Sequence, residues 1–293
     1  MRQTLDLTLA SLKMLLRDSE AFLLAALAPI LFLLVFSLYD LTIAPTGALG
    51  VGGTELDYFD YVLPGVLAMG LMQFTMVGIA GSVARFRETQ VLRRLTATPV
   101  APLAFIAGQV FARLAVSVVQ VFLLLGTGLL LGGTIVGNPV WLVLLAILGN
   151  LSFLALGFAV AGRAPTVDAA NNLAGLLTLP LMFLSGMFFP IASLPGPVRV
   201  VAEWLPITPL IDGMRAVALE GVGIGALGSE VALLALWVVL SFAVARLSFR
   251  MGGPTRRLVR RNRRRAATPA ATPVDLTAAV PAAGRAASAE TAG

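Results

Sequence analysis

The stretch PVWLVLLAILGNLSFLALGFAVA, residues 139–161, contains no charged residue. A helix needs about 20 mostly apolar residues to cross the hydrocarbon core of a bilayer, and this stretch meets both requirements. Over the whole chain of 293 residues, 58% are hydrophobic and 12% are charged. A soluble globular domain carries about 25% charged residues. The sequence therefore predicts an integral membrane protein.

Further apolar stretches on both sides of this segment bring the predicted number of transmembrane helices to six. With 139–161 as the fourth, the others are expected at about residues 22–41, 61–83, 114–133, 173–189 and 227–247. The fifth contains Pro180, which a transmembrane helix tolerates when neighbouring groups satisfy the freed carbonyl. We therefore expect an all-α integral membrane protein whose six-helix domain covers residues 21–250.

The positions of Lys and Arg predict the orientation of these helices, because such residues accumulate in cytoplasmic loops. Of the 21 Lys and Arg residues, all but Arg199 and Arg215 fall in segments on one side of the predicted membrane. Both termini are therefore expected in the cytoplasm.

The two ends of the chain differ from the transmembrane domain. Residues 1–20 have a charged stripe beside a leucine stripe, which predicts an amphipathic helix lying at the membrane interface. A signal peptide is disfavoured because Asp18 and Glu20 directly precede the first apolar run. Residues 251–293 form a basic and then Ala/Pro/Thr-rich tail that we expect to be disordered. Its arginine cluster, 256–265, is expected to bind anionic membrane lipids rather than nucleic acid.

The residue types exclude several kinds of chemistry. The chain has no cysteine and no histidine, so a disulfide framework, a thiolate or histidine metal site and a Ser-His-Asp triad are all excluded. No G-x-x-x-x-G-K-[ST] occurs, so there is no P-loop that could hold ATP. We predict no catalytic residue, no metal site and no cofactor bound by this chain.

The stretch RFRETQVLRRLTATPVAP, residues 85–102, is a charged island between two apolar runs. One helical face of the island holds a carboxylate and three apolar residues, namely Glu88, Val91, Leu92 and Leu95. Two interpretations remain open. In the first, the arginines are simply a topology signal that keeps the segment in the cytoplasm. Alternatively, the segment is a helix that docks on a cytoplasmic partner, because a carboxylate facing lipid is costly.

The island resembles the cytoplasmic loop of type-two permeases of ATP-binding cassette (ABC) exporters, especially the daunorubicin-resistance-like branch. Those permeases carry a Glu, then Gly-Thr-Leu, a basic pair, Leu and a small-Thr-Pro ending. The matching residues are Glu88, Leu92, Arg93, Arg94, Leu95, Ala97, Thr98 and Pro99. Gln90 and Val91 depart from the usual Gly-Thr.

A second pair of stretches is similar to the fifth span and the external hairpin of the same family. They are LPLMFLSGMFFPIASLP at 179–195 and WLPITPLIDGMRAV at 204–217. The residues that carry this likeness are Ser185, Gly186, Phe188, Phe189, Pro190, Leu205, Pro206 and Pro209. The resemblance covers about residues 1–250.

The resemblance implies a particular architecture. A cytoplasmic coupling helix is expected at about 85–98, and an external re-entrant helical hairpin at about 190–222, with short helices near 195–204 and 209–219. Ser185, Gly186, Phe188, Phe189 and Pro190 would belong to this external hairpin and gate. The alternative for that stretch is a simple aromatic belt at the membrane interface.

The resemblance also implies partners and a function. Two permeases, expected to be two copies of this chain, form a pore that two cytoplasmic ATPase subunits power with ATP and Mg²⁺. The expected ATPase contacts are Glu88, Val91, Leu92, Arg93, Arg94 and Leu95. The expected location is the bacterial cell membrane. Because the spans hold few polar groups, we expect an amphipathic or lipophilic cargo, as in drug or antibiotic efflux.

Three other functions are alternatives to this one. A polysaccharide or lipid-linked glycan is another cargo for such a permease. An ion-coupled secondary transporter is disfavoured because the spans have no well-centred Asp, Glu or His. A structural or signalling membrane protein without cargo is disfavoured, weakly, by the glycine-rich and kinked spans.

Single polar residues near the spans suggest mainly structural roles. Arg113, near the inner end of the third span, is expected to extend to the lipid headgroups. Asp212 and Arg215 are spaced to pair with each other on a helix. Polar residues within the spans are expected to form hydrogen bonds between helices; they are Gln73, Thr75, Gln120, Asn150, Thr178 and Ser185.

Overall fold

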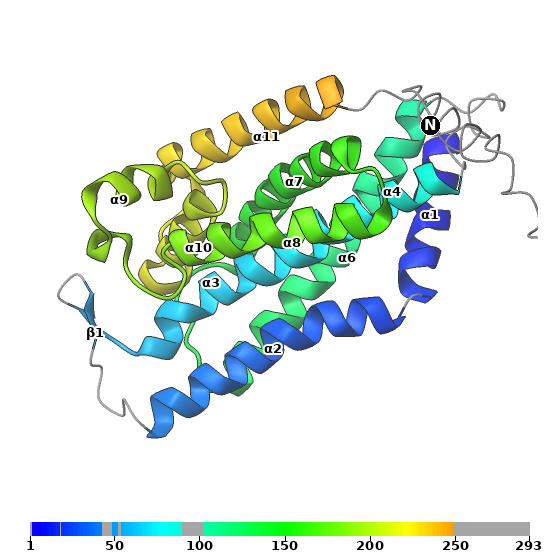
Figure 1. Cartoon of the computed structure of the whole chain (residues 1–293). Helices are drawn as coiled ribbons and strands as arrows, with labels where there is room; N and C mark the ends of the chain where they lie inside the picture. The colour runs from blue at the N-terminus through cyan, green and yellow to red at the C-terminus, as the bar shows by residue number, and fades with distance from the viewer. Residues whose placement is uncertain (1, 18, 43–48, 52–53, 90–101, 249–293) are drawn as a thin grey trace, which may run out of the picture. The chain divides into compact units, whose positions relative to one another are not determined.

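The computed structural model describes residues 2–17, 19–42, 49–51, 54–89 and 102–248, which all lie in one compact unit, Met1–Met251. Most of the described chain is helical (Figure 1). The only strands in these ranges are β1, Leu49–Val51, and β2, Thr54–Leu56, which pair antiparallel with Leu49 opposite Leu56. Apart from this short hairpin, the elements in these ranges are helices, as expected for an all-α fold. The predicted tail, 251–293, lies outside the described residues.

Each expected span overlaps a helical segment, although the fifth, expected at 173–189, ends at Leu184. These segments are α2, Ser19–Thr42; the continuous run of α3, Tyr58–Met72, the π-helix η1, Gln73–Val77, and α4, Gly78–Glu88; α6, Pro102–Leu130; α7, Pro139–Arg163; α8, Val167–Leu184; and α11, Gly228–Ser248.

Four stretches within these helices are long and apolar enough to cross a membrane: Tyr58–Glu88, Ala107–Leu130, Pro139–Arg163 and Val167–Leu184. Two shorter apolar helical stretches, Ala26–Thr42 and Gly228–Leu240, lie within α2 and α11.

The short helices gather at one end of the bundle, and the N-terminal helix lies at the other (Figure 1). The first group comprises η2, Ile191–Ser193; α9, Gly196–Glu203; α10, Thr208–Glu220; and η3, Ile224–Ala226. Helices α9 and α10 occupy the positions predicted for the two helices of the hairpin. At the opposite end, α1, Arg2–Arg17, packs along α6, and Gln109 donates a hydrogen bond of 3.0 Å to Ser11.

Local sequence signals explain where several helices begin and end. The side chain of Asn138 accepts a hydrogen bond from the backbone N–H of Val140, and a proline occupies the first position of α7. Thr166 caps α8 by accepting from the N–H of Ala169. Gly221 ends α10 in the left-handed conformation, with φ 69°.

Helix α3 forms the centre of the bundle. All its residues but the first, Tyr58, are buried, and α2, α6, α7 and α10 pack around it. Helix α8 is the opposite case, since only 22% of its apolar window is buried within this chain. Leu176, Leu179 and Phe183 are the most exposed large side chains on α8.

The π-helix η1 is the main irregularity of the long central helix, and Arg113 binds to it. A π-helical turn shifts the backbone hydrogen bonds and redirects carbonyls away from the regular pattern. The guanidinium of Arg113 donates to the carbonyls of Phe74, at 3.2 Å, and Gly78, at 2.8 Å, and to Ser82 Oγ, at 2.8 Å. Only 2% of Arg113 is exposed. The expectation that Arg113 extends to the headgroups is therefore wrong, because redirected carbonyls inside the bundle bind it instead.

Three of the six polar residues predicted to bridge helices do so, namely Thr75, Gln120 and Asn150. Thr75 of η1 donates to the amide oxygen of Asn150 in α7. Gln120 of α6 donates to the carbonyl of Gly70, at 3.2 Å. Thr178, in contrast, bonds within its own helix.

Candidate functional site

The loop that follows α8 carries the residues predicted for an external gate. The side chain of Ser185 donates to the carbonyl of Met182 at 2.9 Å and so satisfies one of the last carbonyls of α8. Gly186 has φ 75°, and a Cβ atom there would lie 2.6 Å from a side-chain carbon of Ile191. Only glycine adopts this conformation and fits this space readily, so the turn depends on residue 186.

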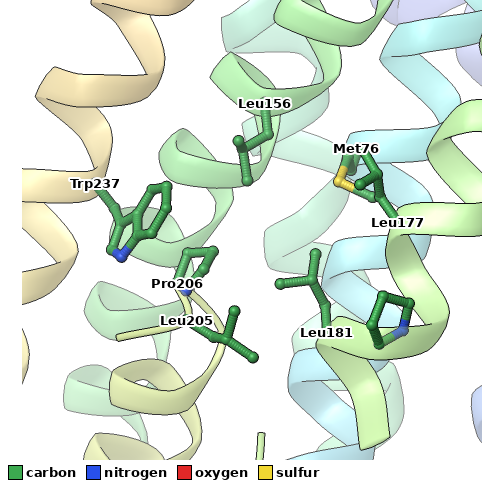
Figure 2. A pocket seen from close by; sticks show the side chains of 8 residues that line it. Met76, Leu156, Leu177, Leu181, Leu205, Pro206 and Trp237 are labelled. Atoms are coloured by element: carbon green, nitrogen blue, oxygen red, sulfur yellow. The ribbon is translucent and has the colours of Figure 1, made fainter. Parts of the chain in front are cut away.

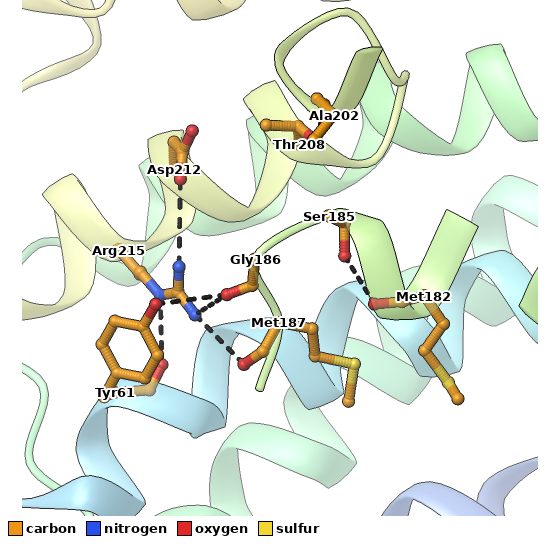
Figure 3. A network of polar contacts seen from close by, with 9 residues as sticks. All are labelled: Tyr61, Met182, Ser185, Gly186, Met187, Ala202, Thr208, Asp212 and Arg215. Carbon is orange, nitrogen blue, oxygen red and sulfur yellow. Dashed lines mark hydrogen bonds and ion pairs between the residues drawn. The ribbon is translucent and has the colours of Figure 1, made fainter. Parts of the chain in front are cut away.

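Arg215 of α10 and Tyr61 of α3 bind this loop together (Figure 3). Arg215 donates to the carbonyls of Gly186, at 2.8 Å, and Met187, at 3.2 Å, and its Nε donates to the carbonyl of Tyr61, at 3.1 Å. The Tyr61 hydroxyl donates to the same Gly186 carbonyl at 3.2 Å. We call this set, Tyr61, Gly186, Met187 and Arg215, the outer latch. It joins α3, α10 and the loop after α8.

The sequence pattern predicts a pair between Arg215 and Asp212 but does not reveal this role of Arg215. That pair exists, but Nη1 and Oδ1 are 3.9 Å apart and 48% of the Asp212 side chain is exposed. Partial burial raises the pKa of Asp212 to about 6, and Arg215 opposes this shift. One signal could have identified Arg215: it is one of only two basic residues in the segments expected outside.

The aromatic residues of the loop divide into one that is packed and one that is exposed. Phe188 lies within 6.2 Å, between ring centroids, of Phe32, Phe36 and Phe183. Tyr58 donates to the carbonyl of Phe188 at 3.4 Å. Phe189, in contrast, is 66% exposed. Phe188 therefore fixes the loop against α2 and α8, and Phe189 remains accessible.

An apolar pocket of about 240 Å³ lies beneath the turn between α9 and α10 (Figure 2). It opens among η1, α7, α8, α11 and that turn, and no charged side chain lines it. The Trp237 Nε1–H donates to the carbonyl of Trp204 at 2.8 Å, which leaves the indole ring to face the pocket. The lining residues are Met76, Leu156, Leu177, Pro180, Leu181, Leu205, Pro206 and Trp237.

At the other end of the bundle, the structure places the first residue of the predicted ATPase contact. Glu88 is the last residue of α4, and Thr89 caps that helix. Helix α4 continues from the central span through Glu88, so residues 85–88 do not begin a separate helix as expected. The other residues of that prediction lie outside the described residues: Val91, Leu92, Arg93, Arg94 and Leu95.

Glu88 and its neighbour Arg87 bind the turn between α7 and α8. Glu88 Oε1 accepts a hydrogen bond of 2.9 Å from the backbone N–H of Val167, the first residue of α8. Arg87 Nη1 donates to carbonyls at the end of α7: 2.6 Å to Ala161, 3.4 Å to Gly162 and 3.3 Å to Ala164. We call Arg87 and Glu88 the inner clamp.

Comparison with known proteins gives a consistent result. The family model of the ABC-2 type transporter matches residues 2–219. Nodulation protein J of Rhizobium leguminosarum bv. viciae is 34% identical over 128 residues, which is 42% of this chain and 49% of that protein. The linearmycin resistance permease protein LnrN of Bacillus subtilis is 25% identical over 172 residues, 59% of this chain and 45% of that protein.

Nodulation protein J of Rhizobium meliloti is 28% identical over 193 residues, 64% of this chain and 71% of that protein. The matches to the first two relatives span only about half of their lengths.

Proposed function

Because this chain belongs to the ABC-2 type transporter family, we propose that it is the transmembrane permease subunit of an ABC exporter. Its ATP is hydrolysed by a separate cytoplasmic subunit. The observation that carries this proposal is the family match over residues 2–219, together with a sequence that has no P-loop of its own.

The proposed membrane arrangement follows the charge distribution and the helices. Helices α2, α3 to α4, α6, α7, α8 and α11 serve as the six spans, in the bacterial inner membrane. The end with α9 and α10 faces outward, and both termini lie in the cytoplasm. Two sequence features support this arrangement: the six apolar stretches and the near absence of Lys and Arg from the outer segments. The short helices between α8 and α11 are consistent with it.

The ATPase is proposed to dock on the segment that directly follows Glu88 and includes Val91, Leu92, Arg93, Arg94 and Leu95. Arginines there suit an acidic surface on a partner protein. Arg87 and Glu88 themselves are held by α7 and α8, so the contact with the partner falls mainly on the residues that follow.

A second copy of this chain is the proposed partner within the membrane. Helix α8 is only 22% buried over its apolar window, and its exposed side chains Leu176, Leu179 and Phe183 are large. Helices in a membrane associate through packing of complementary side chains. A symmetric contact along α8 would place the loop with Gly186 and Phe189 of both copies beside the common axis.

The proposed cargo is an amphipathic or lipophilic compound. Support comes from the pocket, whose lining is wholly apolar and includes Leu177, Leu181 and Trp237 (Figure 2). Such a pocket binds an alkyl or aromatic portion and offers little to a sugar chain. The relative named for linearmycin resistance is consistent with an exporter of a toxic compound.

Inside-out vesicles from cells that express this chain with its co-purifying ATPase provide the test. ATP-dependent uptake of rhodamine 6G, and of a lysophospholipid with a fluorescent headgroup, should be blocked by vanadate and should persist with an uncoupler. Uptake that an uncoupler abolishes and vanadate does not affect would establish the ion-coupled alternative. The absence of any ATPase from a pull-down through this chain would contradict the proposal.

A further inference from the structure

Two adjacent residues of opposite charge bind opposite ends of two successive helices. Arg87 donates to three carbonyls at the C-terminal end of α7, and Glu88 accepts from the first N–H of α8. The last carbonyls and the first N–H groups of helices have no partner within the helix. A cation suits the negative end of a helix dipole and an anion suits the positive end. The inner clamp therefore supplies hydrogen-bond partners both to carbonyls at the end of α7 and to an N–H group at the start of α8.

The helices that the clamp joins also fit closely beneath it. The contact among α4, α7 and α8 is filled by small buried side chains, chiefly Ala80, Ala84, Ala164, Ala170 and Ala174. Alanines let the backbones approach each other, and such contacts leave little room for sliding. Together with the clamp, they hold the end of α4 against the beginning of α8 as one packed unit.

This unit lies between the segment proposed to contact the ATPase and helix α8. Directly after Thr89 comes the segment 90–101, to which the proposed function assigns the ATPase contact. Helix α8 starts at the clamp and ends at Leu184, one residue before the loop of the outer latch. Within this chain α8 is the least buried candidate span, and α4 is the helix on which it packs most extensively.

We infer that Arg87 and Glu88 are positioning residues that transmit movement of the ATPase-docked segment to α8, and through α8 to the loop at Ser185–Pro190. They do so by joining α4 and α8 into a body that moves together. This inference rests on the proposed function, and it differs from the earlier interpretation of Glu88, in which that carboxylate contacts the ATPase directly.

Spin labels can measure whether the two helices move together. The chain has no cysteine, so Arg85→Cys on α4 and Asn172→Cys on α8, both at exposed positions, place a single label pair in each chain. The full chain, purified with its ATPase and diluted with unlabelled copies, is measured without nucleotide and after trapping with ATP and vanadate. The distance between the labels should be the same in both states.

Breaking the clamp should uncouple the two helices. With Arg87→Ala and Glu88→Ala, the label distance should differ between the two states by about 2 Å or more, the size of helix shifts in switching proteins. Glu88→Gln keeps an acceptor oxygen and should behave as the unaltered chain. A label distance that changes in the intact clamp, or that stays constant in the broken one, overturns the inference.

The pull-down separates this inference from its rivals. The broken clamp should retain the ATPase, as should Arg85→Ala, a matched control on the same helix. Loss of the ATPase specifically from Glu88→Ala would show that Glu88 contacts the partner directly, and would overturn the inference while leaving the proposed function intact. Absence of an ATPase from the unaltered chain would overturn both.

Discussion

The guanidinium of Arg215 lies over the ring of Tyr61, 3.7 Å from its centroid, although the two residues are 154 positions apart in the chain. A cation over an aromatic face is attracted to the ring, more strongly where water is excluded. Tyr61 is 5% exposed. Because the same guanidinium also binds the carbonyls of Gly186 and Met187, this stacked pair fixes the loop after α8 to the centre of the bundle.

Removing the cation from the outer latch should destabilise the protein markedly. Arg215→Ala removes three hydrogen bonds to carbonyls and the contact with Tyr61, and we expect a loss of about 3 kcal/mol in stability. Thermal unfolding in detergent, followed by gel filtration of the soluble fraction, measures it. Arg199→Ala is the control, because Arg199 pairs with Glu203 at the surface and such pairs contribute about 0–1 kcal/mol. Equal losses from both changes would show that the latch is unimportant.

A side chain at residue 186 should strain the loop. Gly186→Ala puts a Cβ 2.6 Å from the Ile191 side chain, at φ 75°. Such conformations cost non-glycine residues about 1–3 kcal/mol. We expect a lower melting temperature and reduced transport, measured on the same vesicles. Gly223→Ala is the matched control, since a Cβ at residue 223 would meet no atom within 4 Å and the φ there is negative. A harmless Gly186→Ala would argue against a closely fitted turn.

The long apolar helices were predictable because each depends only on local composition. An apolar run of sufficient length must form a helix in lipid, where every backbone group needs an internal partner. The positions of α9 and α10, in contrast, were expected from the family resemblance of the stretches at 179–195 and 204–217. The start of α7 also follows from Asn138 and Pro139.

The site residues were less predictable because their partners are distant in sequence. Glu88 binds Val167, 79 residues away, and Arg215 binds Tyr61. Arg113 was misassigned for a related reason. Its environment depends on a π-helical turn at Gln73–Val77, and hydrophobic periodicity carries no signal for a local change in backbone hydrogen bonding.

Filling the apolar pocket should reduce transport without unfolding the protein. Leu177 lines the pocket from α8, so Leu177→Trp adds bulk where the apolar portion of the cargo is proposed to bind. We expect the rate of vanadate-sensitive rhodamine 6G uptake to fall several-fold. Val239→Trp on α11 is the control, because Val239 is 66% exposed, does not line the pocket and lies outside the contact proposed along α8. Unchanged uptake in Leu177→Trp would exclude this pocket from the path.

The carboxyl of Asp212 should make stability depend on pH between about 4 and 6. Burial raises its pKa to about 6 from 3.8, with Arg215 opposing and Glu230 and Glu203 adding to the rise. The folded state therefore binds a proton in this window that the unfolded state does not, so stability increases as the pH falls from about 6 to 4.

Asp212→Asn should remove this dependence. In the unaltered chain, the free energy of unfolding should change by less than about 1 kcal/mol over this pH range, because the half-exposed Asp212 side chain is screened by water. Melting temperatures across that pH range, compared between the variant and the unaltered chain, show whether stability increases as the pH falls. A stability that instead rises with pH in the unaltered chain, and not in the variant, would contradict it.

Arg113 should be harder to replace by lysine than by an apolar residue. Its planar fork reaches the carbonyls of Phe74 and Gly78 and the hydroxyl of Ser82 together. Lysine keeps the buried charge but presents it at a single point, so Arg113→Lys should lose about 2 kcal/mol or more. Arg113→Met leaves the same carbonyls without this donor but removes the cost of burying a charge, and should lose less. Detergent melting of the two variants gives the order directly. If lysine were the better replacement, the positive charge, rather than the geometry of the fork at the π-helical turn, would be what this position requires.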